Sequence, residues 1–249
     1  MARGPRLIVS GVALHIVQRG HNRRECFRHD TDYLVYLSNL HELAIKTGCA
    51  LHAYCLMTNH VHLLLTPSKP ESCSLLMRNL GQRYVQYFNR RYQRSGTLWE
   101  GRFRSCLVDS AGYVIACHRY IERNPVRAGM VPSVEAYRWS SYSGNAGHAA
   151  NALLTEHPEY VALAATRASR HQAYRDLCAA GDEAAFLAAI REATHGGFAL
   201  IGEQLRSALP TDQQPRLDRR PPGPRATPKE ADQAQLCIEL ELGLRPRTS

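Results

Sequence analysis

YCLMTNHVHLLL, residues 54–65, reads as strand sequence interrupted near Thr58 and Asn59, and it carries two histidines two positions apart. In a strand, residues i and i+2 point to the same face, so His60 and His62 lie side by side. Two neutral imidazoles on one face can hold a divalent metal if another element supplies a third ligand. A pair of half-exposed histidines at a strand edge also explains the triplet, because a chain with 12 histidines can contain such a triplet by chance. The rest of the sequence must decide between these interpretations.

The segments around this stretch alternate between strand and helix patterns. We expect a strand at the start of 12–27, a helix over 30–48, one or two strands over 49–67, a long helix over 73–96, a strand over 97–110 and a helix over 111–124. The last helix should end at the step to Pro125, because the residue before proline disfavours the α region. This order resembles a ferredoxin-like split βαβ core. We therefore predict an α+β fold whose antiparallel sheet carries its helices on one face.

Composition divides the chain into three parts. Residues 1–147 hold the alternating elements, residues 148–209 read as a helical extension, and residues 210–249 read as a disordered or weakly structured tail rich in Pro and Arg. Within that tail, AQLCIELELGLRP fits a short helix or a short strand. Lys and Arg outnumber Asp and Glu by 19 to 9 in residues 1–147, whereas the other two parts are close to neutral. The basic excess therefore belongs to the first part and favours a polyanionic partner, above all nucleic acid.

The eight cysteines form no C-x-x-C pair, so a zinc ribbon or a thioredoxin-like motif is not expected. The sequence has no apolar run long enough for a membrane span, and its first residues do not resemble a signal peptide. We expect a cytoplasmic protein with reduced thiols and no membrane association.

A second candidate group lies in HRYIERNPVRAG, residues 118–129. Tyr120 and Asn124 are four residues apart, so they share one face of the helix that ends there. Tyr120 could attack a phosphodiester, and the amide oxygen of Asn124 could bind a metal. Alternatively, Tyr120 is a core residue and Asn124 only caps the next segment; Tyr113 is a rival nucleophile. With two nitrogen ligands and one oxygen ligand, the expected ion is hard, Mg²⁺ or Mn²⁺.

The order of these motifs resembles the REP-associated tyrosine transposases, a branch of the HUH single-strand transposases. The likeness runs through residues 8–145, from MTNHVHLLL through GTLWEGRFRS to YIERNPVRAGMV and YRWSSY, and continues in AIREATHGGFALIGEQL. The resemblance implies that His60 and His62 bind the metal and that Tyr120 forms a 5′-phosphotyrosine with single-stranded DNA. Asn124 falls where relatives of the insertion-sequence type carry a glutamine ligand.

Arginines form two candidate DNA-binding groups, one in the loop after the first strand and one in the long helix and the strand that follows it. The candidates are Arg19, Arg23, Arg24, Arg83, Arg90, Arg91, Arg102, Arg104 and Arg127. Aromatic residues between them could stack on unpaired bases, although we expect Phe88 and Trp99 to lie in the core.

Together these features predict a metal-dependent endonuclease and strand transferase for single-stranded or hairpin DNA at palindromic elements, either monomeric or homodimeric. Two alternatives stay open from the sequence. The chain could be a non-catalytic hairpin-binding or regulatory protein that keeps the transposase fold. It could also bind RNA, as many ferredoxin-like sheets do, but such sheets carry aromatic residues where this one carries histidines.

Overall fold

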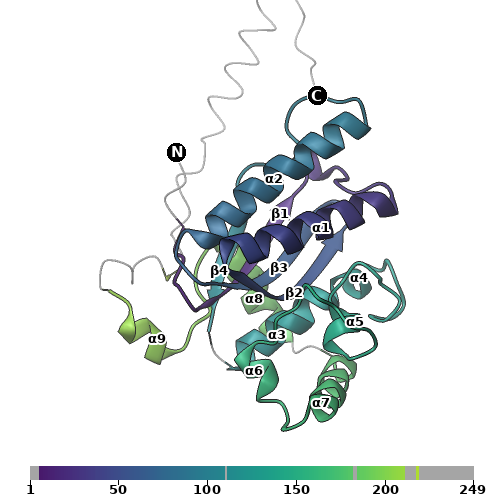
Figure 1. Ribbon diagram of the computed structural model, residues 1–249. Helices are drawn as coiled ribbons and strands as arrows, with labels where there is room; N and C mark the ends of the chain where they lie inside the picture. Colours follow the sequence, from purple (N-terminus) through teal and green to yellow (C-terminus); the bar gives the residue numbers. More distant parts are fainter. Residues whose placement is uncertain (1–5, 110, 182–183, 211–216, 219–249) are drawn as a thin grey trace, which may run out of the picture. The chain divides into compact units, whose positions relative to one another are not determined.

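The computed structural model describes residues 6–109, 111–181, 184–210 and 217–218, and its central element is a four-stranded antiparallel sheet (Figure 1). The strands are β1 (Ala13–Arg19), β2 (Cys49–Met57), β3 (His60–Pro67) and β4 (Arg104–Val108), in the spatial order β2-β3-β1-β4. The helix α1 (Asp30–Thr47) joins β1 to β2, and α2 (Ser72–Arg91) joins β3 to β4. This βαββαβ order confirms the predicted α+β fold with an antiparallel sheet.

Local sequence explains where these elements begin and end. The hairpin between β2 and β3 turns at Thr58 and Asn59, the point predicted from the sequence, and pairs Met57 with His60. Asp32 caps the start of α1 by accepting hydrogen bonds from the backbone N–H groups of Arg28 and His29, at 2.9 and 3.1 Å. That helix stops at Gly48, whose φ of 69° suits a residue without a β-carbon. A short 3-10 turn, His21–Arg23, follows β1.

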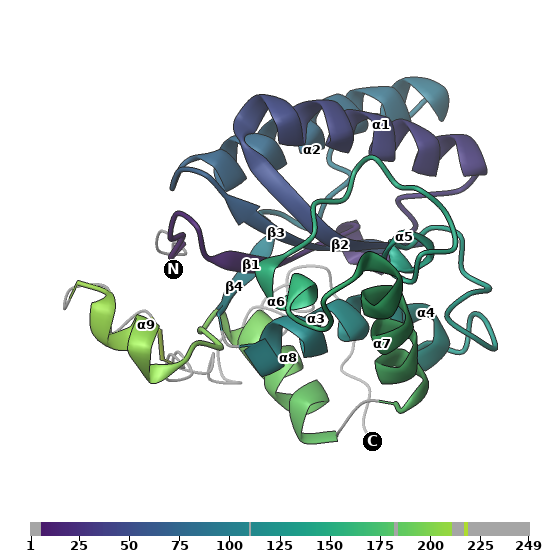
Figure 2. The same ribbon diagram turned by 60° about the horizontal axis from the view of Figure 1, so that its bottom comes forward.

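One face of the sheet is covered by α1 and α2 (Figure 2). Leu14 and Ile16 of β1 and Leu63 of β3 are buried in the core. Aromatic side chains pack around the two helices, with Tyr36 and Tyr84 at 5.1 Å between ring centroids and other rings close by: Phe27, Phe88 and Trp99. The predicted burial of Phe88 and Trp99 is confirmed, because they are 0% and 6% exposed.

The two helices within the βαββαβ core lie on one face, as predicted, and helices that follow β4 cover the other face of the sheet. α3 (Ala111–Glu122) packs on β2 and β3, and α8 (Ala184–Gly196) packs on β4 and β1, opposite α1 and α2 (Figure 2). In β2 every side chain except that of Ala50 is buried. A strand that is apolar on both sides needs both sides covered, and the helices after β4 supply the second cover.

The chain breaks its helical path just after α3. That helix ends at Glu122, and a short helix α4 (Asn124–Arg127) begins after Arg123 with Pro125 in its first turn. Asn124 therefore opens a new helix instead of ending the previous one, although it still follows Tyr120 by about one turn. Another short helix, α5 (Tyr142–Asn145), lies in the segment that leaves the core.

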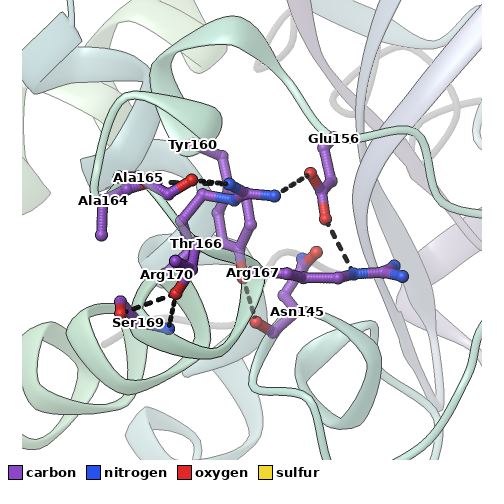
Figure 3. Close-up of polar contacts among 9 residues, drawn as sticks. All are labelled: Asn145, Glu156, Tyr160, Ala164, Ala165, Thr166, Arg167, Ser169 and Arg170. Carbon is purple, nitrogen blue, oxygen red and sulfur yellow. Dashed lines mark hydrogen bonds and ion pairs between the residues drawn. The ribbon is translucent and has the colours of Figure 1, made fainter.

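The remaining helices are α6 (Pro158–Val161), α7 (Arg167–Ala179) and α9 (Glu203–Ala208), so the segment predicted to be helical contains helices. Figure 3 shows the polar contacts that connect the segments around α6 and α7 with each other and with α5. Glu156 forms ion pairs with Arg167 at 3.2 Å and Arg170 at 3.0 Å, and the Tyr160 hydroxyl donates to the backbone oxygen of Asn145 (Figure 3). No helix within the described ranges is long and apolar enough to cross a membrane. The predicted tail, residues 210–249, lies outside the described residues except for 210, 217 and 218.

Candidate active site

Strand register brings three histidines to the sheet face that α3 and α8 cover. β1 pairs Val17 with His62 and Arg19 with His60, so alternate residues of the two strands, including His15, point to that side. The ring centroids of His60 and His62 are 4.9 Å apart, and those of His15 and His62 are 5.2 Å apart. The histidine pair is therefore accompanied by a third imidazole that the sequence analysis did not single out.

α3 and α4 bring the tyrosine and the asparagine to the same histidines. The Tyr120 ring lies 5.8 Å from the His62 ring and 5.7 Å from the His15 ring, between centroids. Asn124 Nδ2 lies 3.0 Å from His62 Nε2. Tyr113, the rival nucleophile, packs instead on Phe186 of α8, with ring centroids 5.3 Å apart. The structure thus gathers the four candidate residues from three separate segments and leaves Tyr113 outside the group.

These side chains open onto a cleft with a volume of about 370 Å³. Its charged lining consists of four arginines and one carboxylate: Arg19, Arg23, Arg102, Arg104 and Glu100. The excess of positive charge suits a polyanion, because each guanidinium can donate two parallel hydrogen bonds to a phosphate. Four of the nine predicted DNA-binding arginines therefore lie at the cleft.

The other predicted arginines have different surroundings. Arg127 places its guanidinium 4.4 Å from the centroid of the Tyr120 ring and donates to the backbone oxygen of that tyrosine. Arg83 pairs with Glu42 at 2.9 Å, and the buried Asp32 attracts Arg91 at 3.6 Å. These two belong to α2, as does the exposed Arg90, and α2 covers the opposite face of the sheet. Arg24 is exposed beside the 3-10 turn and does not line the cleft.

Burial keeps both candidate metal-binding histidines neutral. Desolvation, with the nearby charge of Arg19, lowers the pKa of His60 to about 4. Desolvation and the neighbouring His15 hold the pKa of His62 well below its ordinary value. Burial raises the pKa of Tyr120, and the positive charges of Arg127 and of Arg191 in α8 partly offset that increase. At neutral pH the imidazoles therefore offer lone pairs and the tyrosine is a phenol.

Hydrogen bonds extend from the histidine pair in both directions. His62 Nδ1 lies 2.9 Å from His15 Nε2, and His15 Nδ1 lies 2.8 Å from Thr194 Oγ1 of α8. On the other side, His60 Nδ1 lies 2.6 Å from Asn59 Oδ1. In each candidate ligand Nδ1 is engaged by the protein, which leaves Nε2 as the nitrogen for a metal.

The donor set fits a hard divalent ion. Two imidazole nitrogens and one amide oxygen can bind Mg²⁺ or Mn²⁺ while leaving positions for phosphate oxygens. The atom of Asn124 that faces His62 is the amide nitrogen, so its oxygen becomes a ligand only when the amide turns over. No group of three or more His, Cys, Asp and Glu side chains in the described ranges is arranged to hold a metal.

Sequence reasoning missed His15, Thr194 and Arg191. The available signal for His15 was its place in VALHIVQR, where it interrupts a run of apolar residues. In a strand it points to the same face as Ala13 and Val17. Thr194 and Arg191 lie in the likeness segment AIREATHGGFALIGEQL, but nothing in the sequence connects that segment to the histidine strand.

Comparison with solved structures defines the class of this fold. The chain superposes on a REP-associated tyrosine transposase bound to a REP hairpin with a TM-score of 0.51 and 17% identity, covering 64% of this chain and 93% of that one. A candidate transposase from Deinococcus radiodurans R1 matches at 21% identity and a TM-score of 0.34, covering 46% of this chain and 91% of that one. The fold is thus that of a REP-associated tyrosine transposase.

A sequence match points to the same class of protein. Residues 8–124 match the family described as "Transposase IS200 like". The matched segment contains the four strands and the helices α1, α2 and α3, and it ends at Asn124. This match takes in 117 of the 249 residues, so a little under half of the chain is similar to this transposase family. No curated protein matches the chain.

Proposed function

We propose that this chain is a metal-dependent endonuclease and strand transferase that acts on single-stranded DNA at palindromic hairpin elements. The observation that carries the proposal is the convergence of Tyr120, His60, His62 and Asn124 on one arginine-lined cleft. The REP-associated tyrosine transposase on which the chain superposes is itself bound to a REP hairpin, which supports a hairpin as the DNA substrate. The transposase domain is proposed to occupy residues 1–147, with residues 148–209 as its helical extension.

The proposed reaction exchanges one phosphodiester for another. The Tyr120 hydroxyl attacks the scissile phosphorus, a Tyr–O–P bond forms, and the bond from phosphorus to the 3′-oxygen breaks. The products are a 5′-phosphotyrosine and a free 3′-OH, and the phenol proton ends on that 3′-oxygen. The intermediate still contains a phosphodiester, now between the DNA and Tyr120. A 3′-OH can therefore attack that phosphorus, release the tyrosine and join the strands.

The residues around Tyr120 have separate tasks in this proposal. His60, His62 and Asn124 would hold Mg²⁺ or Mn²⁺, which would polarise the phosphate when bound. Arg19, Arg102 and other cleft arginines would hold the flanking phosphates and orient the scissile bond. Arg127 would keep the Tyr120 ring in place through its contact with the ring face.

A covalent-adduct assay tests the proposal. Labelled hairpin DNA is incubated with the full-length protein and Mg²⁺ or Mn²⁺, and adducts are separated on a denaturing gel. We expect Tyr120→Phe to abolish the adduct, while Tyr113→Phe, the matched control on the same helix, retains it. A persistent adduct in Tyr120→Phe would show that the nucleophile is wrongly assigned. Hairpin retention without any adduct in the wild type, with or without the metal, would instead identify a non-catalytic binding protein.

A further inference from the structure

A chain of four hydrogen-bonded groups begins inside α8 and ends at the proposed metal site. The Thr194 hydroxyl lies 2.7 Å from the backbone oxygen of Ile190, one turn earlier in the helix. A carbonyl oxygen only accepts, so the hydroxyl proton of Thr194 points to it. The lone pairs of Thr194 Oγ1 are then left to accept a hydrogen bond from its next neighbour, His15 Nδ1, at 2.8 Å.

The direction of this first hydrogen bond determines which ring nitrogen carries the proton in His15 and in His62. His15 is 1% exposed and donates through Nδ1, so as a neutral imidazole it carries no proton on Nε2. Its Nε2 therefore accepts from His62 Nδ1, 2.9 Å away. His62, which is 4% exposed, must then present an unprotonated Nε2 toward Asn124 and the cleft.

The second candidate ligand has its own fixed partner and reaches the same state. Asn59 donates through Nδ2 to the backbone oxygen of Arg23 at 3.1 Å, so Oδ1 is the atom that faces His60. His60 Nδ1 donates to that oxygen at 2.6 Å, which leaves Nε2 unprotonated. Two independent sets of contacts thus select the same tautomer in both histidines, with the nitrogen that faces the cleft free of hydrogen.

We propose that His15 and Thr194 are positioning residues that hold His62 as the Nδ1–H tautomer and so prepare its Nε2 lone pair for a divalent cation. The inference rests on the proposed function for the identity of the site, and it adds α8 to that site. A solvated neutral histidine side chain prefers the proton on Nε2, so without the acceptor at His15 the ligand nitrogen of His62 would carry the hydrogen. Partners of this kind typically change metal affinity by about 10- to 100-fold.

Substitutions at Thr194 separate this role from simple packing. Thr194→Val keeps the shape of the side chain but removes the acceptor for His15 Nδ1, whereas Thr194→Ser restores the hydroxyl. Thr47→Val is the matched control, because Thr47 also donates to the carbonyl four residues earlier, that of Leu43, at 2.7 Å, but lies in α1.

The first readout is binding of Mn²⁺ to the full-length protein without DNA, measured by calorimetry. We expect the Kd to rise about 10- to 100-fold in Thr194→Val and to remain near the wild-type value in Thr194→Ser and Thr47→Val. The second readout is the ¹⁵N spectrum of the metal-free, histidine-labelled protein, in which His62 is assigned by its loss in His62→Gln. We expect the Nδ1–H tautomer in the wild type and a shift toward Nε2–H in Thr194→Val.

Wild-type Mn²⁺ affinity and an unchanged His62 tautomer in a folded Thr194→Val protein would overturn the inference. If Thr194→Val does not fold, His15→Gln and His15→Leu take its place, because Gln keeps an acceptor for His62 and Leu does not. Equal Mn²⁺ affinity of those two variants would also overturn the inference. Failure of the adduct assay together with the expected tautomer and Mn²⁺ results would refute the proposed function and leave the inference about the metal site intact.

Discussion

Glu122 is a fully buried carboxylate that lies two residues after the proposed nucleophile. It accepts hydrogen bonds from Ser141 Oγ at 2.5 Å, Asn145 Nδ2 at 2.7 Å and the Tyr174 hydroxyl at 2.6 Å. Burial raises its pKa from 4.5 to about 7, although the three hydrogen bonds lower it. At pH 5 the folded protein therefore keeps a proton here that the unfolded chain has largely released.

This difference makes the stability of the protein depend on pH in a calculable way. When folding raises the pKa of a carboxyl group, the group stabilises the folded protein fully at a pH below its pKa in the unfolded chain. This stabilisation is lost as the pH rises from the unfolded pKa, 4.5, through the folded pKa, about 7. At about 1.4 kcal/mol per pKa unit, the loss between pH 5 and pH 8 is about 2.5 kcal/mol. Glu122→Gln removes the titration and sacrifices one hydrogen bond, which costs about 1 kcal/mol.

Because the unfolded glutamate is already mostly ionised at pH 5, we expect Glu122→Gln to be about 0.2 kcal/mol less stable than the wild type at pH 5 and about 2.3 kcal/mol more stable at pH 8. Urea denaturation of both proteins at the two pH values, with a chelator present, measures the difference. Glu25→Gln, at an exposed glutamate, is the control for removing a carboxylate without burial. An equal stability difference at pH 5 and pH 8 would refute the reasoning, because it would mean that the buried carboxylate does not titrate in this range.

Four further substitutions test other buried or strained positions by thermal or urea denaturation. His118 is 1% exposed, and neither of its ring nitrogens has a hydrogen-bond partner among the residues that the structure describes. Burial holds its pKa well below 6.5, so its contribution to stability falls as the pH drops below that value. Relative to the wild type, His118→Leu should have an unchanged free energy of unfolding or one up to about 1 kcal/mol higher at pH 7, and a larger advantage at pH 5. A variant much less stable than the wild type at both pH values would contradict this. Gly147 and Gly181 both have positive φ, of 77° and 83°, but a β-carbon at Gly147 would lie 2.1 Å from His171 Nδ1 while one at Gly181 meets nothing within 4 Å. Gly181→Ala should cost about 1 kcal/mol and Gly147→Ala clearly more, and equal costs would exclude the steric explanation. Asp32 accepts from two backbone N–H groups and two tyrosine hydroxyls, so Asp32→Asn should cost about 2 kcal/mol, and a neutral result would show that these contacts are not needed.

The sequence was most informative where periodicity and turn signals agreed. The alternation in β3, the turn at Thr58 and Asn59 and the stop at Gly48 are local features, so they could be predicted without knowing the rest of the fold. The burial of Phe88 and Trp99 followed from the apolar spacing of the long helix and the strand segment after it. The juxtaposition of Tyr120 with the histidines came from the family resemblance, because no local rule relates residues sixty positions apart.

Other features depend on tertiary partners that a single sequence does not reveal. α8 covers the second face of the sheet, but its apolar pattern does not say which surface it meets. Arg83 and Arg91 looked like candidates for DNA contacts, yet each faces a carboxylate of α1, Glu42 and Asp32 respectively. His15 looked like an ordinary interruption of a strand, since its partner Thr194 is 179 residues away.

The bond between His15 and Thr194 also has a consequence for the order in which the protein is made. At about 5–20 residues per second, ribosomes need about 10–35 s to extend the chain from one of these residues to the other. The strand with His60 and His62 and the helix with Tyr120 leave the ribosome during that interval, before α8 exists. A nascent chain therefore carries the proposed DNA-cutting residues without the contact that orients them. On the proposal made above, the full affinity for a divalent cation would be reached only after α8 has been synthesised.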